Sequence, residues 1–355
     1  MVSPAPNQAA PVRVLVVDDS ATVRAVLAKR LDAHPEIEVI GRAVDGLDAI
    51  EQVKRLKPDV VTLDVEMPRL DGLGTLKRLM EEAPTRVVMV SSLTGPGAQA
   101  TLQALELGAV DFIEKPASSG ISVASSIADE VSEKVRDAVH ARLRPRVAPK
   151  RLAPPAHGAG LRRWQRHVVM IAASTGGPPA LRTVITSLPA DLGVPVLVVQ
   201  HMPRGFTKSL AERLDEESDV KVEEAERGSR LAPGKVLLAP GGFHMTVDSS
   251  GVIDLNEGPT ECGVRPAANV TMESVVDVYG RHVLGVVLTG MGSDGTRGAG
   301  LIKDAGGSVI VEDEASCVVY GMPRSVARAG FADAELPLEA IATAIVDRSL
   351  AAAAA

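Results

Sequence analysis

The sequence predicts an α/β protein of two domains, each built on a parallel sheet with helices on both faces. Three observations lead to this prediction. Short apolar runs typical of strands alternate with segments of helical periodicity. The alternation occurs twice, and a segment rich in Pro, Ala, Gly and Arg at 144–163 separates the two stretches. The length of 355 residues suits two domains of ordinary size.

The first α/β stretch covers 12–143 and follows a lead at 1–11, whose small, polar and Pro-bearing sequence predicts disorder. Its strands are expected at 12–17, 37–43, 59–64, 86–91 and 110–114, and its helices at 20–31, 45–56, 72–82, 96–108 and 121–143. Several strand runs are apolar at consecutive positions, which is typical of strands buried on both faces. Five strands that alternate with helices predict a five-stranded parallel sheet.

The second α/β stretch covers 164–355. Its strands are expected at 167–174, 194–200, 282–290 and 307–312, and its helices at 178–188, 206–218, 267–280, 294–306 and from there to the poly-Ala end. Turn residues between short apolar segments at 235–255 predict β-hairpins. The alternation predicts a doubly wound α/β domain. The intervening segment, 144–163, lacks apolar periodicity and predicts a solvated linker.

The composition excludes several classes of function. The formal net charge is -7 and aromatic residues make up 2%, which disfavours both a DNA-binding protein and a stacking platform for single-stranded nucleic acid. The apolar runs are far shorter than the ~20 residues of a membrane helix, and the N-terminus lacks a signal-peptide pattern. The two cysteines, Cys262 and Cys317, indicate neither a disulfide framework nor a metal site. We therefore expect a cytoplasmic protein without nucleic-acid binding or membrane insertion.

Charged side chains gather at the carboxyl ends of the strands expected in the first domain. Asp18 and Asp19 follow the first strand, and Asp64 ends the third. Ser91 ends the fourth strand, and Lys115 follows the fifth. These strand ends share one crevice, where three carboxylates need a cation and their oxygen ligands suit Mg²⁺. With a hydroxyl and an ammonium opposite, Asp64 can act as the nucleophile that accepts phosphate. Helix capping explains Asp18 taken alone, but not the whole set.

This set resembles that of response-regulator receiver domains, which residues 12–116 match. The matching motifs are LDVEMPRLDG around Asp64, VSS around Ser91 and DFIEKP around Lys115. The resemblance implies a flavodoxin-like strand order, phosphorylation of Asp64 by a histidine kinase, and a cis peptide bond before Pro116. It also implies a Mg²⁺ pocket made by Asp18, Asp19, Asp64 and the backbone carbonyl of Glu66. Ser91 and Lys115 would contact the phosphoryl oxygens, and Phe112 would be the switch aromatic.

Three residues of the second domain form a candidate catalytic set. Ser174 lies in the run AASTG between a strand and a helix, which approximates a nucleophile elbow near the helix N-terminal amides. His201 closes the strand VPVLVVQ, and Asp294 follows the strand HVLGVVLTG. At a shared crevice, Asp294 can orient the imidazole of His201, which would then take the proton of Ser174.

Each of these residues also has a structural interpretation. Ser174 can be a helix N-cap or part of a phosphate-binding turn, and Asp294 can be the N-cap of the helix that follows it. His201 can be a satisfied structural imidazole, and His244 lies in a turn that is either near the site or structural. The chain order Ser, His, Asp differs from the order Ser, acid, His of α/β-hydrolases, which disfavours that class.

Residues 164–355 resemble the catalytic domain of the CheB family, the chemotaxis protein-glutamate methylesterases. The matching motifs are ASTGG, QHMPRGFTKSLAERL, LTGMGSDG and GMPRSVARAG, the last followed by LPLEAI. By this resemblance Ser174 is the nucleophile, His201 the general base and Asp294 the orienting acid. The resemblance also implies that Thr175 lies beside the nucleophile and that the backbone amide of Met291 stabilises the oxyanion. This chain departs from the family at Ala172, commonly Gly, which suits the site if that residue keeps a negative φ.

The resemblance implies an esterase without a cofactor in its catalytic domain. It would hydrolyse glutamate methyl esters on methyl-accepting chemotaxis receptors and deamidate receptor glutamines, and phosphorylation of Asp64 would relieve an inhibitory contact. Two other classes stay open. One is a phosphorylation-controlled interaction protein with an inactive hydrolase domain, which the presence of all three triad residue types disfavours. The other is a receiver with a DNA-binding output, which the lack of a basic recognition helix disfavours.

Overall fold

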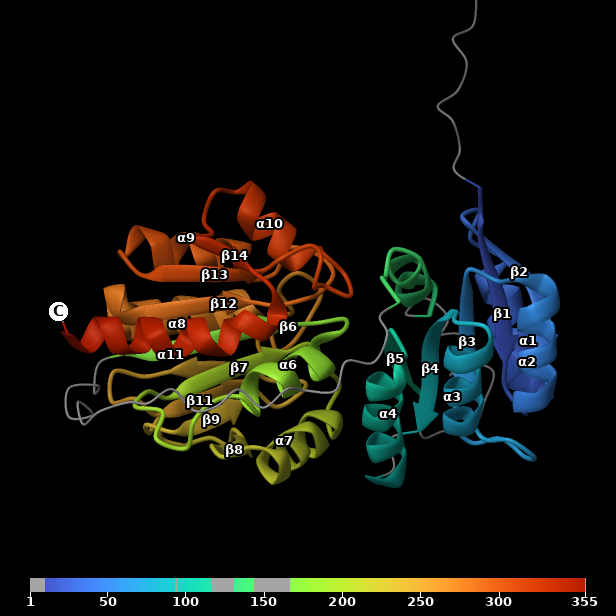
Figure 1. Ribbon diagram of the computed structural model, residues 1–355, viewed down its shortest axis with the longest axis horizontal. Coiled ribbons are helices and arrows are strands. Elements are labelled where there is room, and N and C mark those ends of the chain that lie inside the picture. Colours follow the sequence, from blue (N-terminus) through green and yellow to red (C-terminus); the bar gives the residue numbers. More distant parts are fainter. Residues whose placement is uncertain (1–9, 93–94, 116–130, 144–166, 355) are drawn as a thin grey trace, which may run out of the picture. The chain divides into compact units, whose positions relative to one another are not determined.

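The chain forms two compact units in the computed structural model, which describes residues 10–92, 95–115, 131–143 and 167–354. One unit lies within Met1–Arg146 and the other within Val147–Ala355, and each has its own main sheet (Figure 1). The predicted linker at 144–163, most of the predicted lead at 1–11, and Pro116 of the predicted cis bond lie outside the described residues. The domain boundaries drawn from the sequence therefore stay predictions.

The first unit is a five-stranded parallel sheet with the order β2-β1-β3-β4-β5, the predicted flavodoxin-like order. Its strands are β1 (Val12–Val17), β2 (Ile37–Ala43), β3 (Val60–Asp64), β4 (Arg86–Ser92) and β5 (Asp111–Lys115). Its helices are α1 (Ala21–Leu31), α2 (Gly46–Leu56), α3 (Gly72–Glu82), α4 (Gly95–Leu107) and a segment at 131–138. The strand order reverses between β1 and β3, which places a ligand crevice at their carboxyl ends.

Capping side chains determine where three helices of this unit begin. Ser20, Asp45 and Asp71 accept hydrogen bonds from first-turn amides of α1, α2 and α3. Helix α2 ends at Leu56, and its C-cap residue, Lys57, has the left-handed conformation. Because α1 and α3 follow β1 and β3, these caps fix the loops that border the crevice. The segment predicted to be helical at 121–143 ends its helix at 138, and its first ten residues lie outside the described part.

The second unit has a seven-stranded parallel sheet with the order β14-β13-β12-β6-β7-β9-β8. Its strands are β6 (Val168–Ala173), β7 (Val196–Gln200), β8 (Lys221–Glu224), β9 (Lys235–Leu238), β12 (Val283–Val287), β13 (Ser308–Glu312) and β14 (Ala334–Leu336). Its helices are α6 (Gly177–Ile185), α7 (Phe206–Glu217), α8 (Ala268–Tyr279), α9 (Thr296–Asp304), α10 (Met322–Arg328) and α11 (Leu338–Ala354), with a 3-10 turn, η2, at Gly280–His282. A separate antiparallel pair joins β10 (His244–Val247) and β11 (Ile253–Asn256).

Helices cover the two faces of this sheet in two groups. Helix α6 contacts α7 and α11, whereas α9 contacts α8 and α10. In Figure 1 these groups lie on different sides of the strands. The chain runs outward from β6 to β7 and then returns to β12, so β6 and β12 are neighbours at the topological switch point. No helix in the described part is long and apolar enough to cross a membrane.

The prediction of hairpins at 235–255 is wrong for the first of its strands. Strand β9 lies in the main sheet, parallel to β7 and β8, and only β10 and β11 form a hairpin. The last three residues of β9, Val236, Leu237 and Leu238, are buried, as expected for a strand covered on both faces. The edge strands β8 and β14 were not predicted, because both are short and largely polar or half-exposed.

Candidate functional site

The carboxyl-end crevice of the first sheet holds an acidic cluster. Asp64 is the last residue of β3, Asp18 and Asp19 directly follow β1, and their carboxylate oxygens lie within 4.8 Å of one another. Asp18 and Asp64 are buried, whereas Asp19 is exposed. Lys115, the last residue of β5, places Nζ 2.7 Å from Asp64 Oδ2 and 2.9 Å from Asp18 Oδ2. The structure thus brings together the four charged residues singled out in the sequence.

Two further predicted residues lie on the neighbouring strands. The sheet register pairs Asp64 with Val90, so Ser91 lies one residue beyond the level of Asp64 on β4. Ser91 is buried, and its Oγ donates to the carbonyl of Gly97 at 3.3 Å. Phe112 is buried on β5. Their roles toward a phosphoryl group stay predictions.

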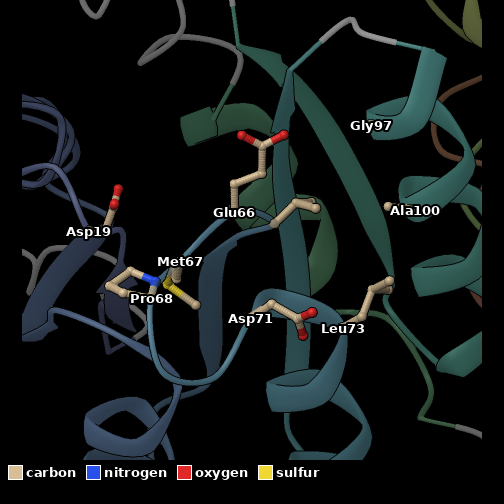
Figure 2. Close-up of a pocket in the computed structure, with 9 residues that line it drawn as sticks. Asp19, Glu66, Met67, Pro68, Asp71, Leu73, Gly97 and Ala100 are labelled. Carbon is tan, nitrogen blue, oxygen red and sulfur yellow. The ribbon is translucent and has the colours of Figure 1, made fainter.

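An open pocket of 590 Å³ adjoins the acidic cluster (Figure 2). Its lining combines three carboxylates with apolar side chains: Asp19, Val65, Glu66, Met67, Pro68, Asp71, Leu73, Gly97 and Ala100. The backbone N–H of Glu66 donates to Asp64 Oδ1 at 3.3 Å, so the loop after β3 is bonded to the buried carboxylate. In the acidic cluster, the carboxylates of Asp18, Asp19 and Asp64 outnumber the single ammonium of Lys115 and leave excess negative charge. Their oxygen atoms fit the ligand preference of Mg²⁺.

Burial and charge pull the pKa values of this cluster in opposite directions. Burial raises the pKa of Asp64 to about 6, and the ammonium of Lys115 only partly opposes that shift. Burial alone would lower the pKa of Lys115, but the carboxylates of Asp64 and Asp18 offset it and the pKa lies above its ordinary value. Lys115 therefore stays charged. At pH 7 Asp64 is ionised as well, and its buried charge lowers the free energy of unfolding.

We expect Asp64 to make the first unit less stable at pH 7 than at pH 4. Its pKa is about 6 when folded and 3.8 in its ordinary state, so the folded chain binds the extra proton between those values. The free energy of unfolding should therefore fall as the pH rises from about 4 to about 6. At about 1.4 kcal/mol for each pKa unit, the loss is about 3 kcal/mol. Amide hydrogen exchange of β3 in the full chain, corrected for the intrinsic pH dependence of exchange, measures it.

The matched control is Asp64→Asn, which cannot titrate. Its protection should lose the share of the pH slope that Asp64 contributes and keep the share of Asp137, whose pKa burial also raises to about 6. Mg²⁺ at pH 7 should increase the protection of β3 in the wild type much more than in the variant. Equal slopes in the two proteins would contradict the assignment of the shift to Asp64.

In the second unit, Ser174 lies at the switch point of the sheet. It directly follows β6, and its backbone N–H donates to the carbonyl of Thr289, beyond β12, at 3.0 Å. A Cβ on Gly290 would approach Ser174 Cβ to 2.8 Å, so the chain after β12 passes closely along the serine. Thr175 is buried beside it, and Met291, next to Gly290, is exposed. The N–H of Gly290 donates to the carbonyl of Val319 at 3.1 Å, and the role of the Met291 amide at the oxyanion stays a prediction.

His201 and Asp294 meet at the same sheet edge. His201 directly follows β7, and its Nε2 lies 2.8 Å from Asp294 Oδ2. With Nε2–H as the donor to the carboxylate, Nδ1 is the ring nitrogen available to accept a proton. The described contacts include no hydrogen bond between the side chains of Ser174 and His201. Such bonds often form only when substrate is bound.

Asp294 is buried among donors that keep it ionised. Its carboxylate accepts from the backbone N–H of Ala268 at 2.6 Å, Asn269 at 3.0 Å and Gly295 at 2.9 Å. Burial by itself raises the pKa of Asp294, but the hydrogen bond and charge of His201 and the amides of Asn269 and Ala268 outweigh it. The pKa therefore lies below its ordinary value, and the carboxylate stays charged next to the imidazole.

The structure decides among the capping interpretations. The N-cap of α6 is Gly176, and no side chain caps it, so Ser174 is not a helix cap. The N-cap of α9 is Gly295, and Asp294 instead bonds the first amides of α8. His244 is structural: it is buried, its Nε2 bonds the carbonyl of Pro259, and its Nδ1 accepts from the N–H of Ala267. The sequence analysis left all three of these alternatives open.

Side chains that the sequence analysis did not single out hold this site in place. Asn269 Oδ1 accepts from the N–H of Gly295 at 3.0 Å and of Gly298 at 2.9 Å, which ties the start of α9 to α8. Thr289 Oγ1 donates to the carbonyl of Thr175 at 2.9 Å, and its N–H donates to the buried carboxylate of Glu312 at 2.8 Å. Ala172 is not among the residues with positive φ, so the departure from Gly at this position is tolerated.

A second group of possible metal ligands lies beside the triad. One atom each of Glu261, Cys262 and Asp294 lies within 4.8 Å of the others. Both carboxylates are already engaged, since Glu261 forms an ion pair with Arg297 at 2.9 Å and Asp294 accepts the four hydrogen bonds given above. Burial also raises the pKa of the Cys262 thiol, which disfavours the thiolate that binds metals. These three side chains carry no argument for a metal centre.

The fold and the site define a receiver joined to an α/β domain that gathers Ser, His and Asp at one sheet edge, and comparison with known proteins gives the same two parts. Residues 14–123 match the response regulator receiver domain, and residues 169–345 match the CheB methylesterase. The protein-glutamate methylesterase/protein-glutamine glutaminase of Symbiobacterium thermophilum is 53% identical over 349 residues, which cover 94% of this chain and 96% of the relative. The protein of the same name from Thermotoga maritima is 45% identical over 95% of this chain and 98% of its own length.

A solved structure extends the similarity to three dimensions. The CheB methylesterase catalytic domain of Thermotoga maritima matches with a TM-score of 0.50 and 44% sequence identity, over 51% of this chain and 98% of the solved chain. The chain therefore belongs to the CheB family of receiver-linked methylesterases.

Proposed function

We propose that this protein is a phosphorylation-activated serine esterase that hydrolyses glutamate methyl esters on methyl-accepting chemotaxis receptors and deamidates receptor glutamines. The observation that carries the proposal is the 2.8 Å contact between His201 Nε2 and Asp294 Oδ2 at the sheet edge where Ser174 lies. Membership of the CheB family supports the substrate class, since relatives that match over nearly the full chain are named for both activities.

The proposed reaction begins with a proton transfer from Ser174 Oγ to Nδ1 of His201. The Oγ attacks the carbonyl carbon of the glutamyl ester, and the tetrahedral oxyanion accepts hydrogen bonds from backbone amides, among them that of Met291. His201 returns its proton to the methoxy oxygen, so methanol leaves and an acyl-enzyme remains. Water, deprotonated by His201, then releases the glutamate and restores Ser174. With a glutamine substrate, ammonia leaves in place of methanol.

Asp294 supports this cycle by holding a negative charge beside the imidazole. Three backbone N–H bonds fix the carboxylate, and its contact with Nε2 orients the imidazole. In the proposed mechanism Nδ1 then serves the serine. The charge stabilises the imidazolium that forms when His201 takes the proton. Thr175, buried next to Ser174, holds the turn through the bond that its carbonyl accepts from Thr289.

In the receiver, Asp64 is the proposed phosphoacceptor and a chemotaxis histidine kinase the proposed phosphodonor. Asp18, Asp19, Asp64 and the carbonyl of Glu66 would hold Mg²⁺, which neutralises the charge of the incoming phosphoryl group when it is bound. Ser91 and Lys115 would contact phosphoryl oxygens, and Phe112 would respond as the switch aromatic. Phosphorylation would then relieve an inhibitory contact with the esterase, in the cytoplasm where kinase and receptor tails meet.

Receptor membranes that carry labelled methyl esters test the proposed chemistry. Incubation with the full chain should release labelled methanol, and receptors with glutamine at the same positions should release ammonia. No methanol from the methylated receptors of the same cell would contradict the esterase assignment.

A further inference from the structure

The side chain of Gln200 bridges the two proposed catalytic turns. Gln200 is the last residue of β7 and is 1% exposed. Its Nε2 donates to the backbone carbonyl of Ser174 at 2.9 Å and to the carbonyl of His201 at 3.2 Å. One amide group therefore contacts the backbone of both the nucleophile and the base, from neighbouring strands of the sheet.

The same amide is held in an unfavourable environment. Gln200 Oε1 is buried and has no hydrogen-bond partner within the described part of the chain. A Cβ built on Gly177 would lie 1.9 Å from this oxygen, so only glycine at 177 leaves room for the amide. The carbonyl of Ser174 already accepts from the N–H of Gly177 at 2.7 Å. A buried oxygen without a partner destabilises the fold. The turn at Ser174 is already closed by the bond from Gly177, so the second bond, from Gln200 Nε2, is not needed to form it.

A residue that disfavours the fold and yet joins the two reacting turns is best explained by function. We propose that Gln200 is a positioning residue of the esterase, which fixes the separation of Ser174 and His201 so that Nδ1 meets Oγ when substrate binds. The inference rests on the proposed function of this pair. Gln200 contacts neither substrate nor the reacting atoms. Its role is to align Ser174 and His201, the two residues that react with the substrate.

The variant Gln200→Met keeps the length and volume of the side chain and removes both donors together with the unpartnered oxygen. We expect its kcat for methanol release to fall by about 10- to 100-fold, as for a small misplacement of reacting groups. Its KM should stay within about twofold, since receptor binding is unaffected. Its melting temperature should stay within about 4 °C of the wild type, because the lost bonds and the lost orphan oxygen oppose each other. Gln200→Asn, too short to reach both carbonyls, should show the same loss of kcat.

Thr271→Val is the matched control in the same domain. Thr271 is fully buried, and its Oγ1 donates to the carbonyl of Met245 at 2.7 Å, so this variant also removes a buried side-chain bond to the backbone. Its melting temperature should fall by about 2–4 °C while kcat stays within about twofold. An unchanged kcat in both Gln200 variants, or an equal loss of kcat in Thr271→Val, would overturn the positioning role.

The rate of covalent labelling of Ser174 by a small fluorophosphonate separates this inference from the proposed function. The reagent reports on the serine and its base without any receptor contact. Labelling of the wild type, with about 10-fold slower labelling of Gln200→Met, supports the inference. Wild-type rates in Gln200→Met would refute the inference and leave the esterase assignment standing. A wild type that neither labels nor releases methanol would refute the proposed function itself.

Discussion

Replacing Ser174 by alanine is expected to lower methanol release from methylated receptors by about 10⁴-fold or more, as the loss of a triad nucleophile does. The variant removes only Oγ, and the turn is held by backbone bonds, so the fold should persist. The N–H of Ser174 still donates to the carbonyl of Thr289, and its carbonyl still accepts from Gly177 and Gln200. The measurement is the initial rate at saturating receptor, with the melting temperature as control. Near wild-type release by a folded Ser174→Ala protein would exclude the serine as nucleophile.

Replacing Asp294 by asparagine should lower kcat by about 10⁴-fold through the tautomer of the imidazole. An amide that points its Nδ2 at His201 would donate toward Nε2 and so favour the proton on Nδ1, the atom that accepts from Ser174 in the proposed mechanism. An amide turned the other way would point Nδ2 at the N–H donors of the α8 and α9 termini. Either orientation removes the charge that stabilises the imidazolium.

The Asp294→Asn rate should be compared with that of Asn269→Ala. Asn269 supports the same region through its bonds to Gly295 and Gly298, and the hydrogen bonds of the described residues include none between its side chain and the histidine. We expect the Asn269 variant to lose stability and to retain far more activity than Asp294→Asn. Wild-type kcat in Asp294→Asn would show that the contact between His201 and the carboxylate is structural rather than catalytic.

The sequence predicted the central strands and the residues at their ends because both depend on local patterns. Consecutive apolar residues identified β1, β3, β6 and β7, and the polar residues that follow such runs emerge at the carboxyl edge of a parallel sheet. That reasoning located Asp64, Ser174 and His201 without any knowledge of their partners. It failed for the edge strands β8 and β14, which bury too little surface to need an apolar run.

The partners of the site residues depend on contacts between distant segments, which no local pattern reveals. Asp294 bonds amides of Ala268 and Asn269, 26 and 25 residues earlier in the chain, and only the packing of α8 against α9 creates that contact. Gln200 had one signal in the sequence, since it is a polar residue that ends an otherwise apolar strand. The direction in which its amide points, toward Ser174 and His201, required the structure.

We propose that phosphorylation of Asp64 controls hydrolysis at Ser174. The most direct test measures methanol release with and without a small phosphodonor and Mg²⁺, in the wild type, Asp64→Ala and Ser174→Ala. We expect the phosphodonor to stimulate the wild type, to leave Asp64→Ala at its basal rate, and to produce no release from Ser174→Ala. Equal stimulation of the wild type and Asp64→Ala, or none in either, would contradict the coupling of the two domains.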